Sequence, residues 1–284
     1  MARRLLEGKT AVITGASRGI GAAVAERFAA EGSGVAIVAR TRDSHDHLAG
    51  SLQETLDKCL AHTARAEMIV ADLSDAEDRA RIIPEAERLL DGPVDILVNN
   101  AAAAIYHPLA DYTLKRRRLT FEVNLHAPVD LLQAALPGMV QRGEGWVVNV
   151  SSATARYEPG TAGQSPERGR QNSTMGVYGA SKAALDRLSF AFAQELWGSG
   201  VRVNCVAPRS AVLTEGTAAL MGDNLDPALI EPLESMVEAI LLLARCPQDM
   251  SGGTYRSLDL LEATSTTAMS LDGARAHESE EHTR

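Results

Sequence analysis

The chain has 284 residues, 45% of them hydrophobic and 23% charged, a composition typical of globular proteins that bury a substantial core. Its formal net charge of −9 argues against a nucleic-acid partner and against binding to an anionic membrane surface. The N-terminus lacks the apolar stretch of a secretory leader, and no run approaches the roughly 18 apolar residues of a membrane span. A cytoplasmic protein is therefore expected.

Cysteine and histidine are sparse and dispersed. Cys59, Cys205 and Cys246 form no C-x-x-C pair and are interpreted as reduced, buried thiols. His45 and His47 lie close together without further Cys or Glu ligands at metal-binding spacing, so no metal site is expected. No break in composition divides the chain, and one large α/β domain is favoured over two small ones.

The first element is a strand followed by a glycine turn and a helix. A β-branched run at residues 9–14 stops at a turn that contains Gly15, Gly19 and Gly21, and residues 22–30 have a helical pattern. Gly15 permits the tight turn, Gly19 lets a ligand approach the backbone, and Gly21 lets the helix pack against the strand. The free N–H groups at the start of the helix suit a pyrophosphate, although glycines also mark plain turns.

The second strand, at residues 34–39, ends at a basic residue. An NAD-specific site has an acidic side chain here for the ribose 2′-hydroxyl, whereas this chain has Arg40. Together with Arg18 in the glycine turn, Arg40 suits a 2′-phosphate, which favours NADP(H) over NAD(H). The alternative is that both arginines are solvated turn residues.

Strands and helices alternate along the rest of the chain. Further strands are predicted at residues 67–71, 94–98, 145–150 and 201–206, with a weaker one at 253–258. Helices are predicted at residues 43–62, 74–91, 111–141, from 178 onward, and at 234–244. This alternation predicts a Rossmann-type, doubly wound parallel sheet of about seven strands with helices on both faces. The carboxyl ends of the strands form its ligand-binding edge, where Asp72 is expected to lie beside an adenine.

A tyrosine and a lysine four residues apart open the helix from residue 178. On a helix, Tyr178 and Lys182 lie on one face and point into the same cleft. A nearby positive charge favours the phenolate, so Lys182 is expected to lower the pKa of Tyr178 toward neutral pH, where the phenol can exchange a proton. Such a pair also occurs by chance on solvated helices, and the accompanying motifs decide for the catalytic interpretation.

Together these motifs resemble the short-chain dehydrogenase/reductase family, in its main, non-extended branch. The resemblance covers approximately residues 5–260 and rests on these motifs: Thr14-Gly15-x-x-x-Gly19-Ile20-Gly21, Asp72-Leu73, Asn99-Asn100-Ala101, Asn124, Ser152 and Tyr178-x-x-x-Lys182. A dinucleotide-binding and catalytic domain is therefore assigned to residues 1–261. Residues 262–284, rich in Ser, Thr and acids, are expected to form a disordered tail.

The resemblance implies an enzyme that transfers a hydride between NADP(H) and a secondary alcohol or ketone. In the family's pattern Tyr178 is the acid or base, and Lys182 binds the nicotinamide ribose and depresses the pKa of the tyrosine. Ser152 binds the substrate oxygen, and Asn124 orders a water that relays protons. The implied cofactor contacts are Gly15, Ser17, Arg18, Gly19, Ile20, Gly21, Arg40, Asp72, Leu73, Asn100, Ala101, Tyr178, Lys182 and Pro208. Homodimers or homotetramers are the expected assembly.

Two of these assignments involve a choice between neighbours. Ser152 is preferred to Ser151 because the family's serine lies just past the strand, a register that can slip by one. Tyr178 is preferred to Tyr157 because the residue four positions after Tyr157 is Thr161 and not a lysine.

The chain also departs from the family's pattern. Ala102 and Arg209 stand where glycines are usual, and Leu258-Asp259-Leu260 replaces a common Asp-Gly-Gly. The serine and the tyrosine are 26 positions apart (178 − 152), roughly twice the usual spacing. These departures keep a second interpretation open, namely a catalytically silent NADPH-binding sensor or scaffold.

The substrate is left open by the sequence. Apolar residues between positions 210 and 232 suit either a lid over a moderately apolar ligand or a packed surface helix. A 3-oxoacyl thioester, a steroid-like ketone and a small xenobiotic alcohol are all compatible. Arg209 hints at an anionic group on the substrate.

Overall fold

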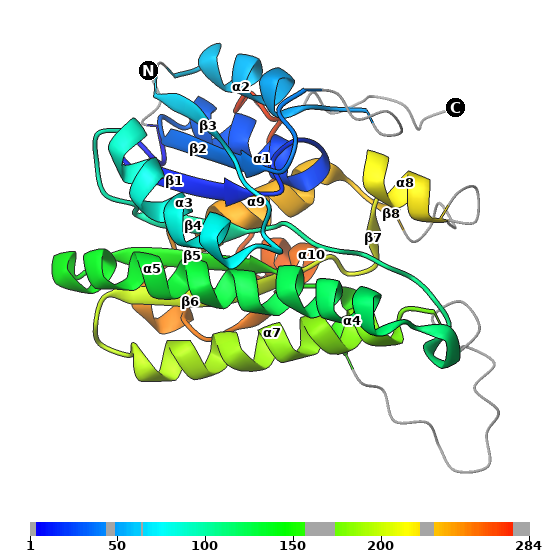
Figure 1. Ribbon diagram of the computed structural model, residues 1–284. Coiled ribbons are helices and arrows are strands. Elements are labelled where there is room, and N and C mark those ends of the chain that lie inside the picture. Colours follow the sequence, from blue (N-terminus) through cyan, green and yellow to red (C-terminus); the bar gives the residue numbers. More distant parts are fainter. Residues whose placement is uncertain (1–3, 44–48, 64, 157–173, 222–229, 275–284) are drawn as a thin grey trace, which may run out of the picture.

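A computed structural model describes residues 4–43, 49–63, 65–156, 174–221 and 230–274 (Figure 1). In this part of the chain, seven parallel strands form one sheet in the order β3-β2-β1-β4-β5-β6-β9. The strands are β1 (Thr10–Thr14), β2 (Gly34–Ala39), β3 (Ala66–Val70), β4 (Ile96–Asn99), β5 (Gly145–Val150), β6 (Val201–Ala207) and β9 (Thr254–Arg256). The chain builds outward from β1 to β3 and then returns to place β4 on the other side of β1. This order confirms the predicted doubly wound sheet.

Alternate residues of each buried strand face two separate hydrophobic clusters. In β1, Ala11 and Ile13 belong to one cluster and Val12 to the other. Helices that contribute to the first cluster are α1 (Gly19–Ala30), α2 (Leu52–Leu60), α9 (Leu233–Leu243) and α10 (Ser257–Ala263). Those that contribute to the second are α3 (Ala76–Leu89), α5 (Ala127–Arg142) and α7 (Gly176–Glu195) (Figure 1). The sheet is therefore covered on both faces, as predicted.

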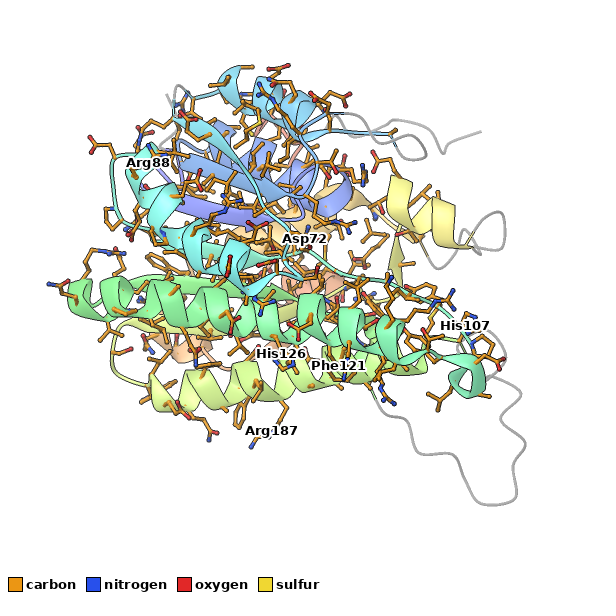
Figure 2. The ribbon with its side chains drawn as sticks, viewed as in Figure 1. Asp72, Arg88, His107, Phe121, His126 and Arg187 are labelled. Carbon is orange, nitrogen blue, oxygen red and sulfur yellow. The ribbon has the colours of Figure 1, made fainter. Side chains whose placement is uncertain are left out.

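The run predicted as a helix at residues 111–141 contains a π-helical turn. Helix α4 (Leu114–Phe121) passes through this turn, Glu122–His126, directly into α5. Figure 2 shows Phe121, just before the turn, and His126, at its end, on the side of α4 and α5 that faces α7. The extra residue of a π turn rotates the side chains that follow it, and such turns are frequent at functional sites.

Other elements differ from prediction mainly at their ends. Helix α2 begins later than expected because the hydroxyl of Ser51 accepts a hydrogen bond from the Glu54 N–H (3.1 Å) and caps the helix. Strand β9 is shorter than expected because α10 follows it at once. Short elements that were not predicted are the 3₁₀ turns η1 (Leu109–Asp111), η3 (Ala153–Ala155) and η6 (Gln248–Met250) and the strands β7 (Ala211–Val212) and β8 (Ile230–Glu231). Helix α8 (Glu215–Met221) lies in the segment for which a lid or a surface helix was expected.

The expectation of a disordered tail from residue 262 is wrong for residues 262–274. After α10 the chain packs back against the first cluster through Ala268 and Leu271. The Met269 N–H donates to Glu238 Oε2 (3.3 Å), a carboxylate that also accepts from the buried Arg27 Nη1 (2.7 Å). A few apolar side chains and one backbone bond thus hold a segment whose average composition is polar. Residues 275–284 lie outside the described part of the chain.

All three cysteines are buried and free, as predicted. Within the described ranges, no helix combines the length and the apolar character needed to cross a membrane. The same residues contain no cluster of three or more His, Cys, Asp or Glu side chains placed to hold a metal ion. His45 and His47 lie outside these ranges.

Candidate functional site

The glycine turn lies where the strand order reverses, between β1 and β4. Asn100, just after β4, donates from Nδ2 to the carbonyl oxygens of Thr14 (3.0 Å) and Gly15 (3.2 Å). The Thr14 hydroxyl accepts from the backbone N–H groups of Asn100 (3.0 Å) and Ala101 (3.1 Å). A Cβ on Gly21 would lie 2.4 Å from both the Gly15 oxygen and Asn100 Nδ2, so only glycine fits there. The structure thus brings these predicted residues together in one compact cradle.

A carboxylate lies against the N-terminus of α1. The Gly19 N–H donates to Glu215 Oε2 at 3.1 Å, and the adjacent Thr214 packs against the same glycine. Glu215 opens α8 and is 196 residues further along the chain, so no local sequence pattern pointed to it. The contact demonstrates that an anionic oxygen can reach this N–H group.

The two arginines predicted for the cofactor have different surroundings. Arg18 donates to two carbonyl oxygens, those of Ala49 (from Nε, 2.8 Å) and Gly50 (from Nη2, 3.2 Å). Arg40 is exposed directly after β2. Arg18 therefore fastens the neighbouring loop to the glycine turn, while the Arg40 side chain projects into solvent at the edge of the sheet.

Asp72 and Leu73 lead from β3 into α3. Asp72 accepts from the N–H (2.9 Å) and the hydroxyl (2.8 Å) of Ser74, and Leu73 is buried. Figure 2 shows Asp72 between the half of the molecule that holds β1 to β3 and the half that holds α5 and α7. The other predicted cofactor residues, all half-buried, are Ser17, Ile20 and Pro208.

The predicted catalytic residues come from the π turn, the end of β5 and α7. Asn124, fully buried in the turn, donates from Nδ2 to Ser181 Oγ (3.0 Å) and accepts the Ala103 N–H at Oδ1 (2.7 Å). Lys182 on α7 is 1% exposed and donates from Nζ to the Val150 oxygen at 2.7 Å. These bonds connect the π turn and the loop after β4 with α7, and α7 with β5.

Tyr178 is buried beside a second aromatic ring and a serine. Its ring packs edge-on against that of Tyr106, with centroids 5.5 Å apart. Burial raises the pKa of Tyr178 above its usual range, Tyr106 adds to this rise, and the nearby Ser152 hydroxyl opposes it. Ser151 instead lies near Asp186, where it opposes the rise in pKa that burial causes. Ser152 is therefore the serine beside the phenol.

The expectation that Lys182 lowers the pKa of Tyr178 is wrong for this arrangement. The pKa of Tyr178 is raised, and Lys182 is not among the groups that shift it. Burial lowers the pKa of Lys182 itself to about 8, with Asp186 the main opposing influence. Loss of hydration is the largest influence on the pKa of both groups, because each is almost fully enclosed. At neutral pH the site holds a neutral phenol and an ammonium ion.

Helix α7 and the segment after β5 are in close contact. A Cβ on Gly179 would lie 2.5 Å from the Thr154 oxygen, closer than such atoms can approach. Thr154 in turn is bound to Ser152, with their hydroxyl oxygens 2.9 Å apart. The missing side chain at Gly179 therefore lets Ser152 reach Tyr178. Most of the long loop between Ser152 and Tyr178, residues 157–173, lies outside the described residues.

Two departures from the family's pattern have local explanations. Ala102 is exposed, so its methyl group displaces no buried neighbour. Arg209 donates to Asp259 Oδ1 (from Nε, 2.7 Å) and to Glu262 Oε1 (from Nη2, 2.8 Å). That Arg209 faces an anionic substrate group stays a prediction, and two carboxylates of α10 compete with such a group for its guanidinium.

Replacing Gly179 by alanine is expected to lower the free energy of unfolding by about 2 kcal/mol, because the new methyl group must push η3 away from α7. Gly176→Ala is the matched control on the same helix, since nothing lies within 4 Å of a Cβ at that position. Its effect should stay within about 0.5 kcal/mol. Urea unfolding of both variants gives the comparison, and equal stabilities would contradict the close contact.

The buried Lys182 predicts a pH-dependent stability. The pKa of Lys182 falls from 10.5 to about 8 on folding. Between these pH values the unfolded chain binds more protons than the folded chain, so the free energy of unfolding increases as the pH rises. The difference between the wild type and Lys182→Met should therefore rise by about 1–2 kcal/mol from roughly pH 7.5 to 9.5. Urea titrations across this range measure it. A constant difference would mean that the lysine titrates normally.

Comparison with known proteins places the chain among its relatives. It matches the family model described as short chain dehydrogenase over residues 9–224. An L-xylulose reductase from Mesocricetus auratus is 32% identical over 263 residues, which cover 89% of this chain and 96% of the reductase.

Two similar solved structures hold NADP. One, described as an NAD(P)-dependent gluconate 5-dehydrogenase from Beutenbergia cavernae, is 31% identical with a TM-score of 0.75 and covers 89% of this chain and 96% of its own. The other, a 3-oxoacyl (acyl-carrier-protein) reductase from Agrobacterium tumefaciens C58, is 33% identical with a TM-score of 0.72. The match covers 88% of this chain and 93% of the reductase. From the family match, the fold and these relatives, the chain belongs to the short-chain dehydrogenase/reductase family and is an oxidoreductase that acts on alcohol or carbonyl groups.

Proposed function

We propose that the protein transfers a hydride between NADP(H) and a secondary alcohol or ketone. The observation that carries this proposal is the position of the buried Tyr178 phenol near the Ser152 hydroxyl, whose partner Thr154 packs against Gly179 on the same helix. One helical turn further, the Lys182 ammonium is fixed on the Val150 oxygen. A proton donor, an oxygen-binding group and a cation therefore lie together at the carboxyl end of β5. The nicotinamide, when bound, supplies the hydride.

Tyr178 suits the role of acid in the reductive direction. The phenol carries a proton at neutral pH, as a tyrosine with an unshifted pKa also would, and can give it to the oxygen of a reacting carbonyl. The Ser152 hydroxyl is placed to hold that same oxygen by a hydrogen bond. In the oxidative direction the two residues would act in reverse.

Lys182 and Asn124 support this pair. The pKa of Lys182, about 8, leaves its ammonium charged at neutral pH, and the N–H groups that do not bind Val150 can bind a ribose. The Asn124 amide holds Ser181 against the loop after β4. It is also the candidate for the proton relay that the family implies.

The residues present fit a nicotinamide dinucleotide. The cradle has no room for a side chain at Gly21, which keeps its backbone open to a ligand. The Gly19 N–H binds a carboxylate oxygen, and a pyrophosphate oxygen can bind the same N–H group in its place. Arg40, exposed after β2, is the cation best placed for a 2′-phosphate, and Arg18 can join it from the glycine turn. These arginines favour NADP(H) over NAD(H), and the NADP bound to similar proteins supports that preference.

A homodimer or homotetramer is part of the proposal. Helix α7 and the turn after it expose three large apolar side chains, those of Leu188, Phe190 and Trp197. The family's expected pairing through its long helices would cover such a surface.

Tyr178→Phe should reduce turnover about a hundredfold or more, because the phenylalanine ring fills the same space without a proton to give. NADPH affinity should stay within about twofold, since the ring and Lys182 are retained. Tyr106→Phe, which loses a phenol but keeps the edge-on ring contact, is the control and should retain turnover. NADPH oxidation with a panel of ketones and a fluorescence titration with NADPH measure the two effects.

Full activity in Tyr178→Phe would overturn the assigned role. Tight NADPH binding by the wild type with no turnover on any ketone would instead favour the silent sensor or scaffold.

Glu215→Gln should tighten NADPH binding by about threefold to tenfold, because it removes a negative charge from the N–H group that a pyrophosphate would use. The gain should be equal for NADH, since both cofactors carry the pyrophosphate. Glu77→Gln, at the start of α3, removes a similar charge at another helix N-terminus and serves as the control. Fluorescence titrations with both cofactors test this, and unchanged affinities would show that the carboxylate does not compete.

A further inference from the structure

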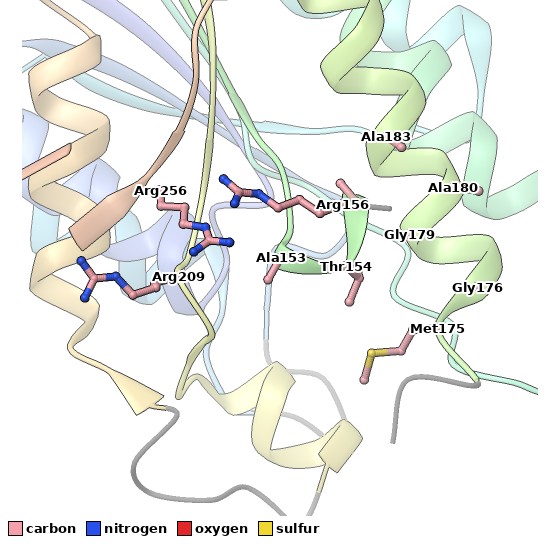
Figure 3. A pocket seen from close by; sticks show the side chains of 11 residues that line it. Ala153, Thr154, Arg156, Met175, Gly176, Gly179, Ala180, Ala183, Arg209 and Arg256 are labelled. Atoms are coloured by element: carbon pink, nitrogen blue, oxygen red, sulfur yellow. The ribbon is translucent and has the colours of Figure 1, made fainter. Parts of the chain in front are cut away.

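A cavity of about 600 Å³ lies beside Tyr178 and Ser152 (Figure 3). The residues that border it include their chain neighbours Ala153, Thr154 and Gly179, so it opens next to the pair without containing them. Its volume is in the range of small-molecule sites. A substrate whose carbonyl is held at Ser152 would extend its remainder into this space.

Every ionisable side chain that lines the cavity among the described residues is an arginine. They are Arg156, after η3, Arg209, after β6, and Arg256, at the end of β9. No acidic residue borders the cavity in the same part of the chain, although the whole chain carries a net charge of −9. The cavity is therefore a basic site in an acidic protein.

Arg209 differs from the other two arginines. Its guanidinium is bound by Asp259 and Glu262, and Figure 3 shows it turned away from the centre of the cavity. The side chains of Arg156 and Arg256 extend toward one another in the same view. Within the described ranges neither of these two forms an ion pair.

One acid on which the charge of Arg156 acts is Asp186 on α7. The charge of Arg156 lowers the pKa of Asp186, while burial raises it more strongly. Asp186 lies beyond ion-pair distance of Arg156 and does not border the cavity. Among the described residues, therefore, no carboxylate pairs with the exposed Arg156 or the half-buried Arg256, and both border the cavity.

Two guanidinium groups that converge without a carboxylate between them repel one another. An oxyanion placed between them removes this repulsion and accepts charge-assisted hydrogen bonds from both, in the paired geometry that guanidinium offers to carboxylate and phosphate. A neutral ligand would leave both charges uncompensated. The arrangement thus selects for a ligand with a terminal oxyanion.

We propose that Arg156 and Arg256 bind a terminal oxyanion of the substrate, so that the enzyme acts on a keto or hydroxy compound that carries a carboxylate or phosphate at its far end. This inference rests on the proposed function, which places the reacting carbonyl at Ser152 and Tyr178. In the reductive direction the carbonyl carbon gains the hydride of NADPH, which becomes NADP⁺, and the oxygen gains the proton of Tyr178. The arginines take no part in this step and fix only which compounds are held.

Paired substrates test the proposal with the full chain and NADPH. 5-Oxohexanoate is compared with its neutral methyl ester, and dihydroxyacetone phosphate with dihydroxyacetone. The wild type should show a kcat/KM at least about tenfold higher for the anionic member of one pair, which also tells carboxylate from phosphate. Arg156→Gln and Arg256→Gln should each lower that value about tenfold and change the neutral member by less than about twofold.

Arg187→Gln on α7 is the matched control. It removes an exposed guanidinium that does not border the cavity, so the anionic-to-neutral ratio should stay within about twofold of the wild type. An equal loss for anionic and neutral compounds in Arg156→Gln and Arg256→Gln would assign these arginines a structural role and overturn the proposal. Turnover of neutral ketones without preference for the anionic partner would overturn it while leaving the proposed function intact.

A binding measurement keeps the proposal testable if none of the four compounds is turned over. Calorimetric titration of 5-oxohexanoate and dihydroxyacetone phosphate, with NADP⁺ present, should show binding of one anion to the wild type and a loss of at least about tenfold in either arginine variant. Absence of anion binding to the wild type would overturn the proposal. Anion binding that depends on both arginines, with no turnover on any ketone, would sustain the subsite and refute the proposed reaction instead.

Discussion

The site depends on how closely the segment after β5 approaches α7. The Thr154 oxygen lies where Gly179 has no side chain, and Lys182 donates to the Val150 oxygen from the next turn of the same helix. These two contacts hold the chain on either side of Ser152, because Val150 precedes it and Thr154 follows it. The distance from Ser152 to Tyr178 is therefore fixed by contacts to backbone oxygens, which are more rigid than contacts between two side chains.

Burial then sets the protonation of the two reactive groups. A phenol without water around it keeps its proton, and an ammonium ion without water around it releases its proton more easily. The site avoids two adjacent ionised groups, since only Lys182 is charged at neutral pH and the Val150 oxygen binds it directly. A neutral phenol has a proton to donate, and a pKa lowered toward neutral pH, as expected from sequence, would have made both donation and abstraction easier.

The sequence was enough to predict those features of the fold and the site that depend on residues close together in the chain. Glycine spacing, strand ends and the Tyr178 motif lie within a few residues of their targets, and the sheet and the predicted cradle followed from them. Features that depend on contacts between residues far apart in the chain could not be predicted from the sequence. Glu215 reaches Gly19 across 196 positions, and residues 262–274 are ordered by Glu238 and the first cluster. The pKa of Tyr178 was predicted with the wrong sign because the tyrosine–lysine spacing reveals the charge but not the loss of water around both groups.

Two of the residues that depart from the family's pattern bind each other in the structure. Arg209 replaces a glycine after β6, Asp259 lies in the segment that replaces Asp-Gly-Gly, and the two side chains bind each other. The same region is tied together by Glu231, which accepts from the Arg209 N–H (3.0 Å) and from the Ser257 hydroxyl (2.6 Å). Because the carboxylates of α10 are engaged with Arg209, they do not pair with Arg256, the residue directly before that helix. The changes that neutralise Arg209 thus leave Arg256, among the described residues, without a carboxylate partner at the border of the cavity.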